Sequence, residues 1–171
     1  MGSGSRTPRR PKRLELRRRA FKRVPAGTAG PRPLTTTAEI SRRMGNVRQQ
    51  GTQAELSVRR VARVLGLRYT TENRDLPGSP DLANRTRRFA VFVHGCFWHR
   101  HAGCTRATTP KTNRRFWIAK FNRNRQRDLE VQRRLEHDCF RTVVIWECEA
   151  EKDAVVARRL APLATPDIGV C

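Results

Sequence analysis

The stretch at residues 91–104, V-F-V-H-G-C-F-W-H-R-H-A-G-C, limits what this chain can fold into more than any other. It holds three of the four histidines and two of the five cysteines, and it continues the apolar run that begins at Phe89. The β-branched and aromatic residues of positions 89–93 predict a buried strand, which Gly95 would end. Side chains in the loop beyond a strand can point into one shared site, so we expect the functional centre there.

The charge of the chain indicates a polyanionic partner. Lys and Arg number 37 against 15 Asp and Glu, which gives a formal net charge of +22. Such a charge destabilises a free folded protein by self-repulsion, and nucleic acid is the simplest partner that offsets it, with an acidic membrane as the alternative. Most of the cations are arginine, which forms paired hydrogen bonds to phosphate and guanine. The bias therefore favours nucleic acid, although the codon usage of a GC-rich genome is a second explanation.

Membrane and secretion signals are not found in the sequence. No apolar run approaches the ~20 residues that span a bilayer, and the basic N-terminus lacks the apolar segment of a secretory signal. We therefore expect a soluble protein in a reducing compartment, where clustered Cys and His side chains favour a metal over disulfides. The odd number of cysteines, five, agrees with this prediction.

The domain organisation predicted is one domain with a basic arm. Residues 1–34 carry runs of Arg and Lys with Gly, Ser and Pro and few large apolar residues, so we expect a disordered arm. Three interpretations of the arm stay open: nonspecific DNA binding, an expression or start-site artefact, and a nuclear or organellar address. Residues 35–171 have a globular composition and sufficient length for one core.

Hydrophobic periodicity predicts an α/β domain with a mixed central sheet flanked by helices. An amphipathic helix is expected over residues 52–65, with Thr52 as its N-cap and Gly66 as its stop. We expect strands over residues 68–73, 81–83, 89–93 and 140–146. Further helices are expected over residues 113–137 and 149–163. The strand at 140–146 is expected in the centre of the sheet because its run F-R-T-V-V-I-W is strongly apolar.

The Cys and His residues have the spacing of a metal site. Cys96-x4-His101-x2-Cys104 forms a local cluster, and Cys148 after the last expected strand is a candidate fourth ligand. Structural zinc sites need four such ligands in a tetrahedron and usually combine a local cluster with a ligand that the fold brings back. The alternative is that Cys96 and Cys148 are small buried hydrophobic residues and His101 is solvated.

A carboxylate lies one hairpin before the Cys/His cluster. Asp81 ends the run P-G-S-P-D, and the strand at residues 89–93 then leads to His94. In metal-dependent phosphodiesterases a carboxylate and a backbone carbonyl bind Mg²⁺, which polarises the phosphate and helps to generate the attacking hydroxide. A neutral histidine nearby can accept the proton of the water. The alternative is that Asp81 is an ordinary turn residue.

Together these runs resemble the very-short-patch (Vsr) mismatch repair endonucleases. The similarity covers about residues 41–149, through P-G-S-P-D, F-V-H-G-C-F-W-H-R-H, G-C, T-T-P-K-T-N-R-R-F-W, N-R-x-R-D and W-E-C. The resemblance implies a restriction-endonuclease-like fold, a divergent branch of the PD-(D/E)XK nucleases. It also implies a Mg²⁺-dependent nick on the 5′ side of the thymine in T:G mismatches, which arise when 5-methylcytosine deaminates.

The resemblance also assigns the residues of the Mg²⁺ site. Asp81 corresponds to the metal-binding aspartate of the family. The main-chain carbonyl of Val93 corresponds to the other protein ligand, at a position where the family often has threonine. Glu55 corresponds to an acidic residue that contacts water on the metal; without the resemblance it would be read as part of a solvated helix face.

The resemblance assigns proton transfer to two histidines. His94 and His99 correspond to the catalytic histidines, with His99 as the general base, oriented by Asp128 on the long helix. For Asp128 too, a solvated helix face is the alternative. Cys96, His101, Cys104 and Cys148 correspond to the ligands of a structural zinc ion, with one more residue before Cys104 than some relatives have.

Aromatic residues correspond to the family's contacts with the base stack. Phe97, Trp98 and Trp117 match an aromatic wedge that enters from the major groove, and Met44 matches a side chain that enters from the minor groove. Opening a base step costs a few kcal/mol, and less where pairing is weak, so a wedge can select mismatched sites by their deformability. Core packing is the alternative for the three aromatic residues.

We therefore predict a monomeric T:G mismatch endonuclease of the bacterial cytoplasm, associated with DNA, with catalytic Mg²⁺ and structural Zn²⁺. Its predicted partner is mismatched double-stranded DNA, and a MutL-type repair protein is an open candidate for a second partner. Two rivals are a nuclease of the same fold with another mismatch or sequence specificity, and a non-catalytic zinc-containing DNA-binding module. Mg²⁺-dependent nicking of a mismatched duplex would separate them.

Overall fold

The computed structural model describes residues 51–165. The predicted basic arm, residues 1–34, and the predicted DNA contact Met44 lie outside the described residues. Among the helices that are described, none combines the length and the apolar character that a membrane span requires.

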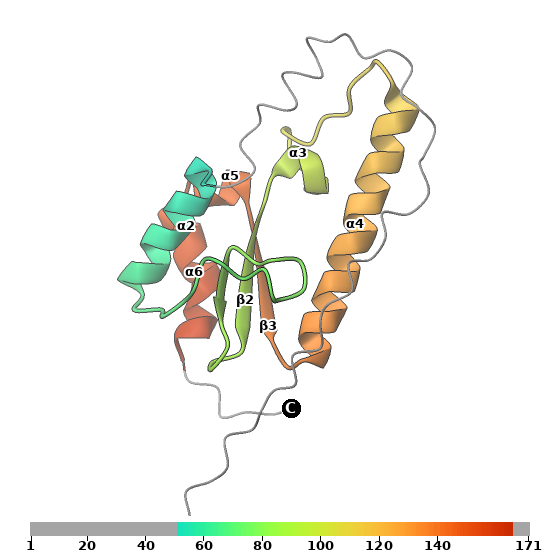
Figure 1. Cartoon of the computed structure of the whole chain (residues 1–171). Coiled ribbons are helices and arrows are strands. Elements are labelled where there is room, and N and C mark those ends of the chain that lie inside the picture. Colours follow the sequence, from blue (N-terminus) through green and yellow to red (C-terminus); the bar gives the residue numbers. More distant parts are fainter. Residues whose placement is uncertain (1–50, 166–171) are drawn as a thin grey trace, which may run out of the picture.

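A three-stranded sheet lies between two helical layers (Figure 1). Helices α2 (Gln53–Val64) and α6 (Asp153–Ala164) cover one face of the sheet, and the long helix α4 (Arg114–His137) covers the other. The described part of the chain thus has the mixed α/β architecture predicted from the sequence.

The sheet has the strand order β1-β2-β3. Strand β1 (Leu82–Asn84) pairs antiparallel with β2 (Phe89–His94), and β3 (Arg141–Trp146) pairs parallel with β2. The expected central position of the last strand is therefore wrong for the described residues, because β2 is the strand with two neighbours. The apolar run of β3 reflects burial of its two faces by helices, which a sequence cannot distinguish from pairing along both edges.

The strand expected over residues 68–73 is reduced to one isolated bridge. Thr70 exchanges both backbone hydrogen bonds with Ala83, at N···O distances of 2.8 and 3.0 Å. Beyond it the buried side chain of Asn73 donates to the carbonyls of Thr70 and Pro80, at 2.9 Å each. This side chain closes the segment into a loop, so the ladder does not continue.

The two faces of β2 supply two hydrophobic cores. Phe89 and Val91 point into the core shared with α2 and α6, whereas Ala90 and Phe92 point into the core shared with α4. This alternation follows from the two-residue period of a strand. The helices contribute the buried residues Val58, Val61, Ala62, Leu135, Val156, Leu160 and Leu163.

Two of the three predicted helices begin and end within one residue of the predicted boundaries. Helix α2 begins with a capping box between Thr52 and Glu55, and Gly66 follows its end with a φ of +68°. Helix α4 begins one residue after the predicted start, with Asn113 as its N-cap. Both helices have the long apolar periodicity that makes sequence-based boundaries reliable.

One predicted loop and the third predicted helix need correction. The loop expected after β2 forms a one-turn helix, α3 (Cys96–His99). The closing helix expected over residues 149–163 is split into α5 (Glu147–Ala150) and α6, with exposed polar residues between them. The split buries Ala150 and also turns the apolar face of α6 toward the sheet.

The loop before β1 packs closely against α4. A Cβ atom at Gly78, where φ is +72°, would lie 2.6 Å from a methyl carbon of Val131. Both the positive φ and the contact require glycine at this position. The loop that leads into Asp81 is therefore fixed from one side by α4 and from the other by Asn73.

Candidate active site and metal centre

Asp81 lies directly before β1 and against the carboxyl-terminal half of β2. Its Oδ2 atom accepts a hydrogen bond from the backbone N–H of Val93 at 2.7 Å. Burial raises the pKa of Asp81 to about 6, and the negative charge of Glu55 adds to the rise, although the hydrogen bond from Val93 opposes it. Without a cation, the ionised carboxylate is therefore unfavourable at this place.

Glu55 is buried at the start of α2, with 6% of its surface exposed. Its oxygens accept hydrogen bonds from the backbone N–H of Gly51 at 2.9 Å, the hydroxyl of Thr52 at 3.0 Å and the guanidinium of Arg59 at 3.1 Å. The helix N-terminus and Arg59 thus provide hydrogen-bond donors for this buried carboxylate. Glu55 and Asp81 form a pair of carboxylates near each other, which is a donor set that suits a hard divalent cation.

Two histidines lie at the carboxyl end of β2 and just beyond it. The rings of His94, from the strand, and His99, from α3, are stacked with centroids 3.9 Å apart and planes 12° from parallel. Burial and the neighbouring His99 lower the pKa of His94 to about 4, so His94 is neutral at pH 7. Nδ1 of His99 lies 2.5 Å from Oδ2 of Asp128 on α4. A carboxylate that accepts Nδ1–H orients the ring and leaves Nε2 as the basic nitrogen.

A cavity of about 630 Å³ is lined by Glu55, Val93 and His99, whereas Asp81, His94 and Asp128 lie behind these residues and are not part of its lining. It lies between the start of α2, the end of β2, α3, the middle of α4 and α5. One wall carries the carboxylates of Glu55, Glu147 and Glu151, and another carries the cations Lys120 and Arg127. Opposite charges on two walls of one cavity can hold a cation and a phosphate at the same time.

Five aromatic rings form a cluster where α3 meets the first half of α4. Phe97 lies with its ring centroid 5.0 Å from that of Trp98 and 5.5 Å from that of Trp117. Trp117 is 7% exposed, whereas Phe97 and Trp98 are only partly buried, and Trp98 also lines the cavity. Phe116 and Phe121 complete the cluster from α4. The structure thus brings three of the predicted DNA contacts together beside the histidines.

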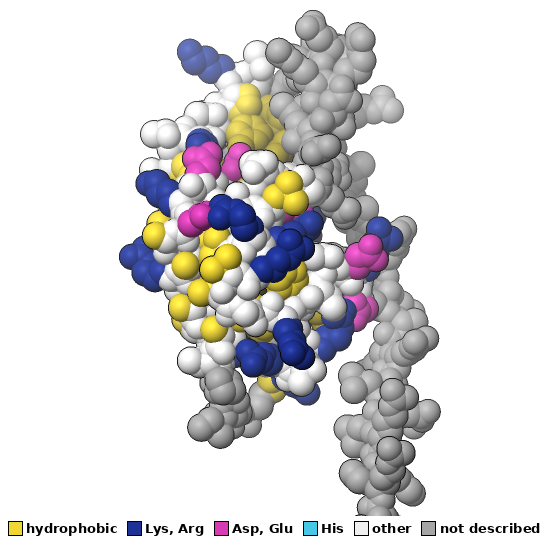
Figure 2. Space-filling view, turned by 90° about the vertical axis from the view of Figure 1, so that its left-hand side faces the viewer, with side chains coloured by type: hydrophobic (Ala, Val, Ile, Leu, Met, Phe, Trp, Pro, Cys, Tyr) yellow, Lys and Arg dark blue, Asp and Glu magenta, His cyan; other side chains and the backbone are white. Residues whose placement is uncertain are grey.

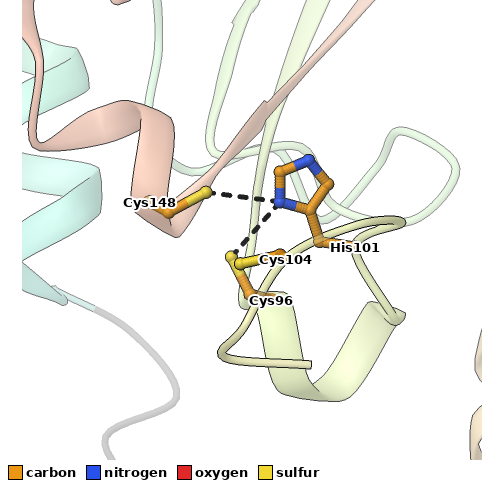
Figure 3. Close-up of side chains that lie close together, drawn as sticks. All are labelled: Cys96, His101, Cys104 and Cys148. Carbon is orange, nitrogen blue, oxygen red and sulfur yellow. Dashed lines mark hydrogen bonds between the residues drawn. The ribbon is translucent and has the colours of Figure 1, made fainter. Parts of the chain in front are cut away.

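The four predicted metal ligands converge (Figure 3). Cys96 comes from α3, His101 and Cys104 from the segment that follows, and Cys148 from α5. Their ligand atoms all lie within 4.8 Å of one another, and Nδ1 of His101 is 3.3 Å from the Cys148 sulfur and 3.7 Å from the Cys96 sulfur. Burial raises the pKa of Cys96 to about 12, so this thiol needs a cation beside it to ionise. The cluster can hold a metal ion.

Two supporting residues were not found from the sequence. Asn73, which is 2% exposed, fixes the carbonyl of Pro80 and so the backbone next to Asp81. Arg127 lines the cavity one position before Asp128, and its charge contributes to the low pKa of His94. Arg127 belongs to the run N-R-x-R-D, but the sequence does not distinguish it from the many other arginines of this helix.

The nearby carboxylates of Asp81 and Glu55, the contact of His99 with Asp128 and the cationic wall of the cavity are compatible with hydrolysis of phosphodiester bonds, and comparison with known proteins gives the class, a DNA endonuclease. The sequence model of the family described as DNA mismatch endonuclease Vsr matches residues 34–106. The chain belongs to the Vsr family and is a DNA endonuclease of the Vsr type.

Three relatives illustrate the similarity. The type II nicking enzyme V.XorIIP of Xanthomonas oryzae pv. oryzae is 37% identical over 123 residues, which cover 72% of this chain and 90% of that protein. The type II nicking enzyme V.NaeI of Lentzea aerocolonigenes is 35% identical over 144 residues, 81% of this chain and 86% of its own. The DNA mismatch endonuclease Vsr of Escherichia coli strain K12 is 35% identical over 109 residues, 62% and 69% of the two chains. The resemblance identified from sequence motifs is thereby confirmed.

Proposed function

We propose that this endonuclease nicks one DNA strand on the 5′ side of the T in T:G mismatches that arise from deamination of 5-methylcytosine, and so starts very-short-patch repair. The observation that carries the proposal is the shared cavity, which has acidic groups on one wall, cations on another and a carboxylate-oriented histidine between them. The name of the Escherichia coli relative, DNA mismatch endonuclease Vsr, supports the mismatch as substrate.

The cation of the reaction is proposed to be Mg²⁺, bound by Asp81 and by the main-chain carbonyl of Val93, with Glu55 close by. Burial, with a further contribution from the charge of Glu55, raises the pKa of Asp81, and a bound cation would remove the cost of ionising this carboxylate. The chemistry supplied there is that of a Lewis acid, which polarises a phosphate and acidifies water. Val93 supplies the same backbone carbonyl that any residue would, so valine is compatible with the role.

Proton transfer is proposed for His99. Its Nε2 accepts the proton of the attacking water, while Asp128 holds Nδ1–H and stabilises the imidazolium that forms. His94 stays neutral and packs flat against His99, which keeps the ring of the base in place. Arg127 and Lys120 line the wall where the negative phosphate would lie.

Mismatch selection is proposed for Phe97, Trp98 and Trp117, with Met44 from the other groove. The first two are partly exposed beside the cavity, and the more deeply buried Trp117 supports them from α4. A preformed aromatic cluster can enter a base step without first reorganising. The free energy needed to open the step then decides which DNA sites the cluster can enter.

Basic side chains elsewhere support binding to the DNA backbone. They are spread over the face that carries α2 and α6 (Figure 2). Along α4 the exposed arginines are Arg114, Arg115, Arg123, Arg125, Arg127 and Arg133. Such cations neutralise phosphates regardless of sequence, which gives affinity and a strong dependence on salt.

The Cys/His cluster is proposed to hold structural Zn²⁺, since three sulfurs and one imidazole nitrogen match a known zinc donor set. The restriction-endonuclease-like fold, the monomeric state and the cytoplasmic location stay proposals of the same kind. A MutL-type repair protein stays a candidate partner.

Strand nicking on a panel of matched and mismatched duplexes, with and without Mg²⁺, tests the proposal. We expect one nick, 5′ of the T in the T:G duplex, that requires Mg²⁺ and is lost in Asp81→Ala. The control variant is Asp138→Ala, which removes an exposed carboxylate at the far end of α4. Several relatives are named type II nicking enzymes, which favours a second candidate: nicking at another mismatch or sequence. A nick in a different duplex of the panel would replace the first proposal with the second.

A further inference from the structure

Trp146, the last residue of β3, lies between the Cys/His cluster and the histidine pair. Its ring stacks on His101, with centroids 4.3 Å apart and planes 7° from parallel. It also meets the ring of His94 edge to face, at 5.6 Å and 71°. One indole therefore contacts a candidate metal ligand on one side and a histidine of the active site on another.

The sheet register places Trp146 there. In the parallel pairing of β2 with β3, His94 and Trp146 are direct partners at the carboxyl ends of the strands. Its backbone N–H donates to Oε2 of Glu149 at 3.1 Å, and Glu149 in turn binds Arg159 at 2.9 Å. The backbone of Trp146 is thus fixed by the first turn of α5, the helix that carries Cys148.

The packing of Trp146 is not that of an ordinary core residue. It belongs to neither of the two hydrophobic cores, and it is only partly buried. The rings that it contacts are both imidazoles. A residue kept for apolar burial would lie among aliphatic side chains, whereas this one joins two polar centres.

The contact continues to the carboxylate of Asp128. His94 stacks on His99 at 3.9 Å, and His99 is bound to Asp128 at 2.5 Å. His101, Trp146, His94 and His99 therefore form one continuous series of ring contacts. Closely packed groups of this kind cannot shift independently, because each ring limits the positions of the next.

We propose that Trp146 is a positioning residue that couples the structure of the Cys/His cluster to the position of the histidines in the active site. It holds His94 at the angle at which His94 packs flat on His99. The catalytic part of this inference rests on the role of His99 in the proposed function. The structural part, that the ring of His94 depends on the indole, does not.

The activity-independent test is the NMR spectrum of the histidine side chains. The chain has four histidines, so their ring signals can be assigned by single substitutions. We compare wild type with Trp146→Leu, which removes the flat ring, and Trp146→Phe, which keeps one. The control is Phe140→Leu, the same loss of an aromatic ring just before the opposite end of β3. Zinc content and circular dichroism are measured on every variant.

In Trp146→Leu the His94 signal moves from the loss of the indole ring current alone, so the diagnostic change is expected in the signal of His99, which the indole does not contact and which stacks on His94; the exposed His137 stays unchanged and zinc stays bound. Nicking by this variant should show a kcat lower by roughly 10–100-fold with KM unchanged, the usual range when a residue behind a site is lost. Trp146→Phe should restore kcat to within about three-fold, since a flat ring still separates the two imidazoles. Phe140→Leu should leave the His94 signal and kcat as in wild type.

An unchanged His99 signal in a folded Trp146→Leu variant would overturn the inference, whatever the activity. A moved His99 signal with an unchanged kcat would overturn the proposed role of His99 in proton transfer and leave the indole's positioning of the histidine pair standing. If the Leu variant does not fold, Trp146→Met takes its place, because Met fills the space without a flat ring. An equal shift in the Phe140→Leu control would also contradict a specific role for Trp146.

Discussion

Replacing Asp81 by asparagine should abolish nicking and at the same time stabilise the protein in Mg²⁺-free buffer. Burial raises the pKa of Asp81 from 3.8 to about 6. At 1.36 kcal/mol per pKa unit, the ionised carboxylate costs the folded state about 3 kcal/mol above pH 6. Asparagine has no such cost and can still accept from the N–H of Val93. Because its NH₂ group needs a partner of its own, we expect a net gain of about 1–3 kcal/mol at pH 8.

The sign of the pH dependence follows from the direction of the pKa shift. The folded protein binds the Asp81 proton more tightly than the unfolded chain does. The contribution of Asp81 to stability is therefore complete below about pH 4 and is lost as the pH rises through 6. The advantage of Asp81→Asn should grow over the same window, with about half of it present at pH 5.

Urea unfolding of wild type, Asp81→Asn and the matched control Asp138→Asn provides the measurement. Chelators are omitted, because they would also strip a metal from the Cys/His cluster. The exposed Asp138 should change stability by less than ~0.5 kcal/mol at either pH. Added Mg²⁺ should stabilise wild type and not Asp81→Asn, since only wild type keeps the ligand. An Asp81→Asn variant that is less stable than wild type at pH 8, or whose gain is the same at every pH, would refute the reasoning.

The remaining predictions concern the base, the cluster and the aromatic residues. His99→Ala should lower the nicking rate about 10²–10⁴-fold without changing Mg²⁺ affinity, and an unchanged pH–rate profile would contradict its role as base. Cys148→Ser should release the metal and lower the melting temperature, because binding of a structural zinc contributes on the order of 10 kcal/mol to folding; purified wild type without about one zinc per chain would count against the site. Trp98→Ala should weaken binding to T:G duplexes by about 1–3 kcal/mol while matched DNA binds as before, and equal losses for both duplexes in titrations would mean that the ring does not read the mismatch.

Local patterns in the sequence were sufficient to predict the elements with long periodicity. The N-cap at Thr52 and the length of α4 were predicted because capping and helix spacing depend on neighbouring residues. The four Cys/His positions also converge as predicted, since three of them lie within nine residues of one another. Short elements were missed: α3 is a single turn, too short for any periodicity to appear.

Features that depend on register were not accessible from the sequence. The apolar run at β3 predicts burial, but only the fold shows that helices supply it and that β3 borders β2 alone among the described strands. In the same way, the contact of Trp146 with His94 and His101 arises from the alignment of two strands separated by α4. The hydrogen bond from Asn73 to the carbonyl of Pro80 depends on the closure of a loop, which no sequence pattern predicts.

The two halves of helix α4 make different contacts. Its 24 residues extend over about 36 Å, and its second half packs on the sheet through Val131 and Leu135, whereas its first half carries the aromatic cluster beyond the sheet (Figure 1). The first half lies outside the two hydrophobic cores of the sheet, so its exposed positions, such as Ile118 and Arg123, can change without loosening those cores. With the aromatic cluster as the DNA contact, as proposed, new substrate preferences can evolve at these exposed positions at little cost in folding, while Asp128, the proposed partner of the base, stays at the boundary between the two halves.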